Sequence, residues 1–171
     1  MHNAITNFSI GYQKVSNDIH PTKFTNEQGE PLAEIAASDV GVKGSEGSVS
    51  NNYLFNELFY DSELEKKNIT TNLREVVVFT KIPKNSIKIP VAGGASYSPD
   101  FAYVLNYKDG QQKLHFIVET KDTDEGSLRN EERQKIAHAE HFFGEVIQIE
   151  FKTQFSTQKI TDLIKEIHPR H

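Results

Sequence analysis

The sequence predicts an α/β domain in which a central mixed β-sheet is flanked by helices. Three observations support this. Segments with helical spacing of apolar residues lie on both sides of a group of β-branched runs, an Asp-Gly pair marks a hairpin between two of these runs, and a further strand and helix follow. Strands that alternate with helices indicate a sheet covered by helices. At 171 residues the chain is long enough for one ordinary core.

The composition fits one globular domain and excludes several kinds of site. Apolar residues make up 36% of the chain and charged residues 25%. With no cysteine, the chain can form neither a disulfide framework nor a thiolate zinc site, and it has no cysteine nucleophile. No apolar run approaches the roughly 20 residues that cross a bilayer, and the first residues lack the features of a signal peptide, so we expect a cytoplasmic protein.

The formal net charge of −5 bears on nucleic-acid binding. Contacts between basic side chains and phosphates supply most of the non-specific affinity for nucleic acid, so an acidic chain is a poor free-standing binder. We therefore expect any DNA that this chain meets to be held mainly by another domain or subunit.

The first part of the chain predicts an arm and a loop, followed by helix. Residues 1–52 carry scattered apolar groups without a sustained period and end in the Gly/Ser-rich stretch GVKGSEGSVSNN, so we interpret them as an N-terminal arm and loop. Residues 53–73 have apolar residues at roughly helical spacing, and Asp61-Ser62 can cap a second segment, so one or two helices are expected. The main domain is predicted over 53–171.

The remaining elements follow from runs of strand or helix length and from the residues that end them. Pro90 ends a short strand, and Gly144 is a natural helix end. The predicted elements are strands at 74–82 and 85–91, a hairpin at 97–121, a helix at 127–144, a strand at 145–151 and a helix from Ser156 or Thr157 to Pro169.

The hairpin sequence predicts a register. Asp109-Gly110 is a strong signal for a two-residue turn, which sets Lys108 opposite Gln111. Carried outward, this register makes one face of the ladder wholly apolar. The predicted cross-strand pairs are Phe101 with Val118, Tyr103 with Phe116, Leu105 with Leu114, Ala102 with Ile117 and Val104 with His115.

At the far end of the hairpin, the register brings ionisable side chains together. Asp100 falls opposite Glu119, and Lys121 lies two residues on, hence on the same face as Glu119. Like charges that oppose each other destabilise a sheet unless a cation lies between them. Magnesium prefers oxygen ligands, so Asp100, Glu119 and the backbone carbonyl of Thr120 make a suitable open site. The Lys121 ammonium would position a water and steady phosphorane charge.

A solvated end of a hairpin is the ordinary explanation of such charges, and a Glu-x-Lys pair often occurs by chance. Here several features coincide: Pro-Asp at the start of one strand, Glu-x-Lys at the end of its partner, a register that aligns them, and a helix next. This conjunction favours the functional interpretation.

The same residues resemble the PD-(D/E)-x-K nuclease superfamily, with SPDF supplying the Pro-Asp and VETK the (D/E)-x-K. The resemblance extends to YLFNELFYDSELEKK, VFTKIPKNSIKIPVAGGASYSPDFAYVL, LHFIVETKDT and LRNEERQKIAHAEHFF. Together these strings are similar to the C-terminal endonuclease domain of the restriction subunit of type III restriction-modification enzymes, over roughly residues 53 to 151.

The resemblance implies a restriction-endonuclease-like fold and assigns roles to particular residues. By it, Asp100, Glu119 and Lys121 are the catalytic triad, Mg²⁺ is the cofactor and double-stranded DNA is the substrate. The superfamily often adds a glutamate from the first core helix. The segment DSELE offers Glu63 or Glu65 for this role, and Glu65 is favoured.

The resemblance also implies partners. Such restriction subunits carry a helicase motor and work with a methyltransferase (modification) subunit, whereas this chain has no G-x-x-x-x-G-K-[ST] loop to bind a nucleotide. We therefore expect a separated nuclease domain or a short relative that depends on partners. Two alternatives remain: a repair or junction-resolving nuclease with the same triad, and a non-catalytic DNA-clamp or assembly module that retains the fold.

Other residues are weaker candidates for DNA contact. Arg129 and Lys135, in the helix after Lys121, could touch phosphate or could simply balance nearby glutamates. Gly94 could let a DNA backbone approach closely, although a plain turn explains it equally well.

Overall fold

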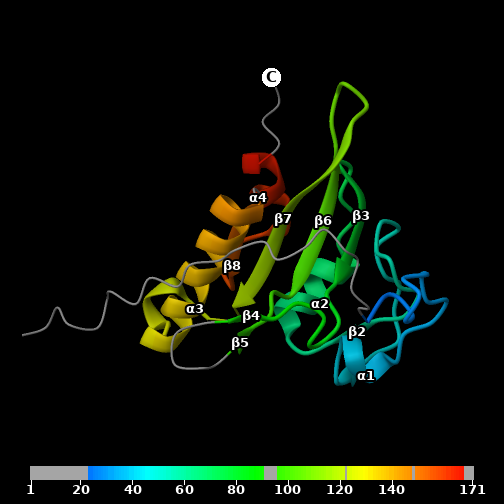
Figure 1. Ribbon diagram of the computed structural model, residues 1–171, viewed down its shortest axis with the longest axis horizontal. Helices are drawn as coiled ribbons and strands as arrows, with labels where there is room; N and C mark the ends of the chain where they lie inside the picture. The colour runs from blue at the N-terminus through cyan, green and yellow to red at the C-terminus, as the bar shows by residue number, and fades with distance from the viewer. Residues whose placement is uncertain (1–22, 91–95, 122, 148, 168–171) are drawn as a thin grey trace, which may run out of the picture.

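A four-stranded mixed sheet forms the centre of the computed structural model, which describes residues 23–90, 96–121, 123–147 and 149–167 (Figure 1). In spatial order the strands are β3 (Val76–Lys81), β6 (Phe101–Asn106), β7 (Gln112–Lys121) and β8 (Glu150–Phe155). Strand β6 pairs antiparallel with β3 and β7, whereas β8 pairs parallel with β7. The predicted mixed sheet is confirmed, and the architecture is that of a restriction-endonuclease-like α/β domain.

Helices cover both faces of this sheet. Phe101 and Tyr103 of β6 belong to a core cluster that includes buried residues of α2 (Glu63–Thr70) and α4 (Ile160–Ile167). Ala102, between them in the strand, packs instead against a second cluster that includes Ala139 of α3 (Asn130–His141). Because alternate strand residues point to opposite faces, α2 and α4 cover one face and α3 the other.

The predicted helical region 53–73 is helical only in its second half. The residues before α2 form bends and the two-residue strand β2 (Phe59–Tyr60). Helical spacing misleads here, because Leu54, which would share a helix face with Leu58, is 49% exposed. Tyr53 and Leu58 are buried instead, and Tyr53 forms a bridge to β3. Packing against the sheet therefore overrides the local pattern.

The described part of the predicted arm and loop contains short elements. Helix α1 (Ala37–Val40) is a single turn, and β1 (Lys43–Gly44) pairs antiparallel with β2. At Gly41 an added Cβ would lie only 2.4 Å from the backbone nitrogen of Tyr60, so this close approach requires glycine. Residues 37–44 thus contact the main domain through β2. The division into 1–52 and 53–171 stays a prediction.

The β6–β7 register is correct at the site end and wrong near the turn. The N–H of Tyr107 bonds to the carbonyl of Gln111, so the loop comprises residues 108–110 and not the predicted two-residue turn. Gly110, with φ of +80°, takes the left-handed position that such a loop requires. The actual pairs near the loop are Val104 with Leu114, Leu105 with Lys113 and Asn106 with Gln112.

A bulge restores the predicted register. The pairing shifts between Tyr103 and Val104, because His115 is an extra residue in β7. Beyond it, Phe101 pairs with Val118 and Tyr103 with Phe116, as predicted. The expected pairs of Leu105 with Leu114 and Val104 with His115 are therefore wrong, and Leu114 is exposed. The two deviations cancel at the end of the hairpin that bears Asp100.

The chain after β7 departs from prediction at its helix end. A 3₁₀ turn (Glu125–Ser127) precedes α3, and the chain continues through a π-helical segment (Phe142–Ile147) instead of stopping at Gly144. In this segment Phe143 stacks on Phe151 with ring centroids 5.7 Å apart, which explains the extra turn. The predicted strand at 145–151 is consequently displaced to β8. Among the described helices, none is long and apolar enough to cross a membrane.

The predicted strand at 85–91 is reduced to β4 (Ile89–Pro90), which pairs with β5 (Ser96–Tyr97) in a small separate sheet. Asn85 has a positive φ of 65°, and the N–H of Ser86 bonds to the carbonyl of Pro83. The chain therefore turns where the sequence pattern predicts an extended strand.

Candidate active site

Asp100 lies directly before β6 and is fixed to both neighbouring strands. Its Oδ2 accepts hydrogen bonds from the backbone N–H of Thr120 at 2.9 Å and from the Thr120 hydroxyl at 3.1 Å. Its carbonyl oxygen accepts a bond from the N–H of Ile82 at 2.7 Å. The Asp100 carboxylate is thus held at the middle residue of the Glu-Thr-Lys sequence.

The end of β7 places the other predicted residues in the sheet. Glu119 pairs in the ladder with Thr153 of β8, but its side chain lies outside the described atoms. Lys121 is half-buried beside the start of α3. The pKa of Glu132 in α3 is lowered, first by a hydrogen bond from the N–H of Arg129 and also by the charge of Lys121. The described geometry therefore joins Asp100 to the β7 segment that carries Lys121.

Glu65 is buried and belongs to the N-terminal cap of α2. Ser62 accepts a bond from the Glu65 N–H at 3.2 Å, while Glu65 Oε2 accepts bonds from the N–H groups of Asp61 at 2.6 Å and of Ser62 at 3.4 Å. Burial raises the pKa of Glu65, Lys81 opposes this, and the charge of Asp100 adds to it. Glu63, the other candidate, is exposed.

Lys81 and Asp61 form a charged network with Glu65 that the sequence analysis does not predict. The Lys81 ammonium lies 2.9 Å from Glu65 Oε2 and 2.5 Å from Asp61 Oδ2, although Lys81 is only 3% exposed. Burial opposes ionisation of Asp61, but Lys81, the N–H of Val42 and Lys84 together lower its pKa. A signal existed in the sequence: Lys81 is two residues after the buried Phe79, so it occupies a position that faces the core.

Comparison with known proteins identifies the kind of domain. A model of the family described as "Endonuclease domain" matches residues 51–158, more than half of the chain. The chain belongs to this endonuclease-domain family. No solved structure shows a significant match.

The relatives of this endonuclease domain are longer proteins. The chain is 52% identical to the Res subunit of the type III restriction-modification enzyme EcoPI from Escherichia phage P1, and 51% identical to that of EcoP15I from Escherichia coli. Each alignment covers 99% of the chain but 18% of the relative. The chain thus spans about a fifth of their length, and the resemblance found in its motifs is confirmed.

A buried amide pair holds the helix of Glu65 against the sheet of the endonuclease domain. Asn68 of α2 and Gln154 of β8 exchange side-chain hydrogen bonds of 2.6 and 3.2 Å, and both residues are 1% exposed. Gln154 pairs with Thr120 in the ladder. The amide pair therefore ties α2 to Gln154, which lies beside Thr120 in the sheet, and Thr120 in turn binds Asp100.

The donor set fits a magnesium ion. Within the described ranges, no group of three or more His, Cys, Asp or Glu is arranged to hold a metal. Magnesium, however, commonly takes only one or two protein carboxylates and completes its shell with water and substrate phosphate. Asp100, the carbonyl of Thr120 and Glu65 offer hard oxygen donors of the kind that magnesium prefers.

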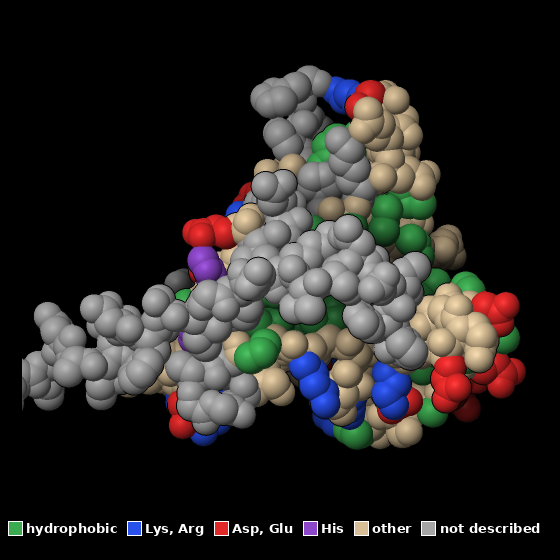
Figure 2. All heavy atoms as spheres, in the orientation of Figure 1, with side chains coloured by type: hydrophobic (Ala, Val, Ile, Leu, Met, Phe, Trp, Pro, Cys, Tyr) green, Lys and Arg blue, Asp and Glu red, His purple; other side chains and the backbone are tan. Residues whose placement is uncertain are grey.

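The candidate DNA-contacting residues stay predictions. Arg129 is exposed and its Nε lies 4.0 Å from Glu132, while Lys135 is half-buried in α3. Gly94 lies outside the described residues. On the face shown in Figure 2, Lys and Arg side chains of the described atoms form small separate groups. Contacts of Arg129 and Lys135 with DNA stay predictions.

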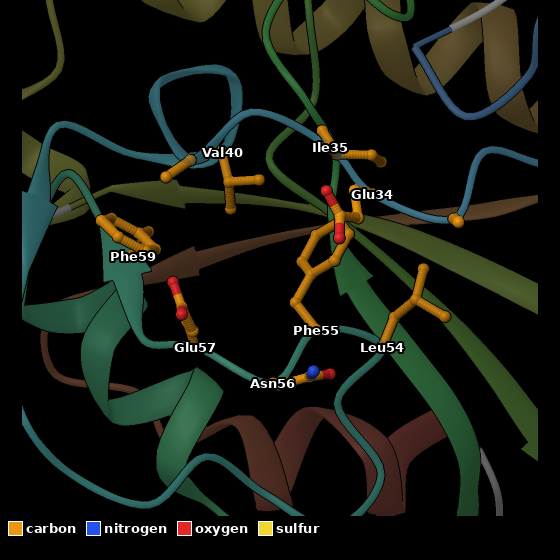
Figure 3. A pocket seen from close by; sticks show the side chains of 10 residues that line it. Glu34, Ile35, Val40, Leu54, Phe55, Asn56, Glu57 and Phe59 are labelled. Atoms are coloured by element: carbon orange, nitrogen blue, oxygen red, sulfur yellow. The ribbon is translucent and has the colours of Figure 1, made fainter.

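A pocket lies apart from these residues, between the segment around α1 and the bend before β2 (Figure 3). Its lining includes Ile35, Val40, Leu54 and Phe55, with the carboxylates of Glu34 and Glu57 at its edge. None of the described candidate site residues lines it.

Proposed function

We propose that the domain hydrolyses phosphodiester bonds of double-stranded DNA as the nuclease part of a type III restriction enzyme, and that it requires Mg²⁺. The observation that carries this proposal is the bonding of Asp100 to Thr120, which joins the Pro-Asp before β6 to the Glu-Thr-Lys at the end of β7. Family membership and the similarity to Res subunits support the reaction.

In this proposal, Asp100, Glu119 and the carbonyl of Thr120 hold the metal, with Glu65 as an accessory group. When bound, magnesium lowers the pKa of an attacking water and offsets the charge that develops on the phosphate. The two bonds from Thr120 keep the Asp100 carboxylate oriented before metal or DNA arrives. Lys121 contributes a positive charge that orients the water and stabilises the transition state.

The proposed partners are DNA, a helicase motor domain and a modification methyltransferase subunit. The chain covers 18% of its Res relatives, so these partners would be supplied by further sequence or by another subunit. The net charge of −5 agrees with DNA being held by them. Because the proposed substrate is DNA, we expect the protein to act in the cytoplasm. Similarity to Res subunits favours this function over a repair nuclease or a DNA clamp.

Removal of metal tests the proposed reaction. In the enzyme assembled with its motor and modification subunit, EDTA should abolish cleavage of a DNA substrate, and excess Mg²⁺ should restore it, because the proposed metal lowers the pKa of the attacking water. Gel analysis of the DNA products measures this. Continued cleavage in EDTA would exclude a metal-dependent nuclease, and DNA binding without cleavage in Mg²⁺ would support the non-catalytic alternative.

Glu65 and Glu63 provide a matched comparison within one helix turn. We expect Glu65→Gln to raise the Mg²⁺ concentration for half-maximal cleavage by about 10-fold or more, because the buried carboxylate of the proposed accessory group is lost. Glu63→Gln should change it little, since Glu63 is exposed. Cleavage is measured over a Mg²⁺ series. A larger effect of Glu63→Gln would move the accessory role to Glu63.

A further inference from the structure

We propose that Lys81 is a positioning residue of the nuclease site: its ammonium fixes the orientation of the Glu65 carboxylate, while the next residue in the chain binds the backbone of Asp100. This inference rests on the proposed function. Lysine is rarely buried, yet Lys81 is 3% exposed at the end of β3 and contacts two carboxylates. Such a charge in a core position requires an explanation beyond packing.

The contacts of Lys81 orient Glu65. Its ammonium binds Oε2 of Glu65, the same oxygen that accepts the N–H groups of Asp61 and Ser62. Three donors on one oxygen fix the rotation of the carboxylate and direct Oε1 away from the cap. Lys81 is itself fixed by Asp61, which also accepts the N–H of Val42 at 2.9 Å. The Glu65 side chain is thus held before any metal binds.

The position of Lys81 in β3 links Glu65 to Asp100. The next residue, Ile82, donates its N–H to the carbonyl of Asp100 at 2.7 Å, and Lys81 pairs with Phe101 in the ladder. The last residue of β3 and the residue that follows it therefore bind the two acidic residues, Glu65 through the Lys81 side chain and Asp100 through the Ile82 backbone. This arrangement sets the spacing of Glu65 and Asp100 by the rigid geometry of one strand.

The charges give the same conclusion. Glu65 is buried, and its carboxylate lies 2.9 Å from the equally buried Lys81 ammonium. A buried ion pair adds little net stability compared with apolar residues of similar volume, so stability alone does not account for a lysine here. Removing Lys81 alone would leave the Glu65 carboxylate buried without its cation. Removing the charges of Lys81 and Glu65 together would leave no uncompensated charge at Glu65, with the partly exposed Asp61 still beside Lys84, but would not restore the oxygen ligand.

Four versions of the full chain separate the positioning role from a structural one: wild type, Lys81→Met, Glu65→Gln and the double variant. Mg²⁺ alone is the probe, and its dissociation constant is measured by titration calorimetry, with the thermal unfolding midpoint as a second readout. We expect Lys81→Met to weaken Mg²⁺ binding about 10- to 100-fold, as for other residues that orient metal ligands. The double variant should match Glu65→Gln, because Lys81 acts through Glu65.

Lys84→Met is the matched control. Lys84 lies in the same network, 3.4 Å from Asp61, but is half exposed and binds Asp61 on the other oxygen. Its loss should change the Mg²⁺ constant less than about 2-fold, as for ordinary surface substitutions.

Several outcomes would overturn the assignment. One is a folded Lys81→Met variant whose Mg²⁺ dissociation constant equals that of wild type. Another is a double variant whose Mg²⁺ dissociation constant exceeds that of Glu65→Gln by the same factor by which Lys81→Met exceeds wild type. If Lys81→Met does not fold, the double variant decides, because equality with Glu65→Gln supports the role and a further loss refutes it. If Asp100→Asn leaves Mg²⁺ binding unchanged, the proposed function itself fails. A shift with Asp100→Asn but none with Lys81→Met refutes only the role of Lys81.

Discussion

Replacement of Lys121 by alanine is expected to lower DNA cleavage by the assembled enzyme about a hundred- to a thousandfold, the usual cost of removing one group that stabilises transition-state charge. The fold should persist, because Lys121 is only half-buried at the end of β7 and the change removes a charge from the edge of the site. Single-turnover cleavage at saturating Mg²⁺ measures the loss, and thermal unfolding measures stability.

Lys159→Ala is the control for Lys121→Ala. Lys159 is an exposed lysine just before α4, so its loss changes the net charge equally without touching the β6–β7 end. Cleavage by that variant should stay near wild type. If Lys121→Ala also cleaves at the wild-type rate, Lys121 is not a catalytic residue, and the Glu-x-Lys motif would be only a solvated strand end.

The sequence predicted the site end of the hairpin correctly, although its turn was wrong. The two-residue turn at Asp109-Gly110 was an error of loop length, since Gly110 at φ of +80° can serve either loop. The bulge at His115 corrected the register before Phe101. Nothing local marks His115 as a bulge, but burial of Phe101 and Tyr103 on one face requires the pairing that the bulge restores.

Prediction failed where tertiary packing decides the local structure. Leu54 and Leu58 match a helical period, yet the chain at this point inserts Tyr53 beside Phe79, with ring centroids 5.2 Å apart. Single-segment periodicity contains no information on that contact. The same limit applies to the predicted helix end at Gly144, where stacking of Phe143 on Phe151 accompanies a π-helical continuation of the helix.

The charged network was missed for a different reason. Asp61-Ser62 was identified as a possible helix cap, but Glu65 completes a capping box, which gives it a local structural role as well as the proposed accessory one. The partner of Glu65, Lys81, is distant in sequence, and only the fold brings β3 to α2. A lysine in phase with the apolar residues of a strand therefore indicates a buried counter-charge.

The second large effect is expected for Asp100→Asn. This variant should lose cleavage, and magnesium should reverse the order of stability of the variant and wild type. Without metal, asparagine can still accept both bonds from Thr120 through its amide oxygen, while the repulsion between Asp100 and Glu119, which the predicted register sets opposite each other, is removed. The variant should then be as stable as wild type or more stable by about 0.5 to 1 kcal/mol, as for other like-charged neighbours in sheets. Low ionic strength makes this gain easier to see.

With Mg²⁺ at about 100 times its dissociation constant, wild type should gain about 2.7 kcal/mol of stability by linkage, and Asp100→Asn should gain much less. The order of the two thermal unfolding midpoints is therefore expected to differ between EDTA, where Asp100→Asn is at least as stable, and Mg²⁺, where wild type is more stable. Asp109→Asn is the control, because Asp109 also accepts a backbone N–H, from Gln111 at 2.9 Å, but lies in the distant hairpin loop and should show no such crossing. If Asp100→Asn is instead several kcal/mol less stable than wild type in EDTA, the Asp100 charge stabilises the fold through its bonds from Thr120. A paired-carboxylate metal site would then be the wrong explanation of this end of the sheet.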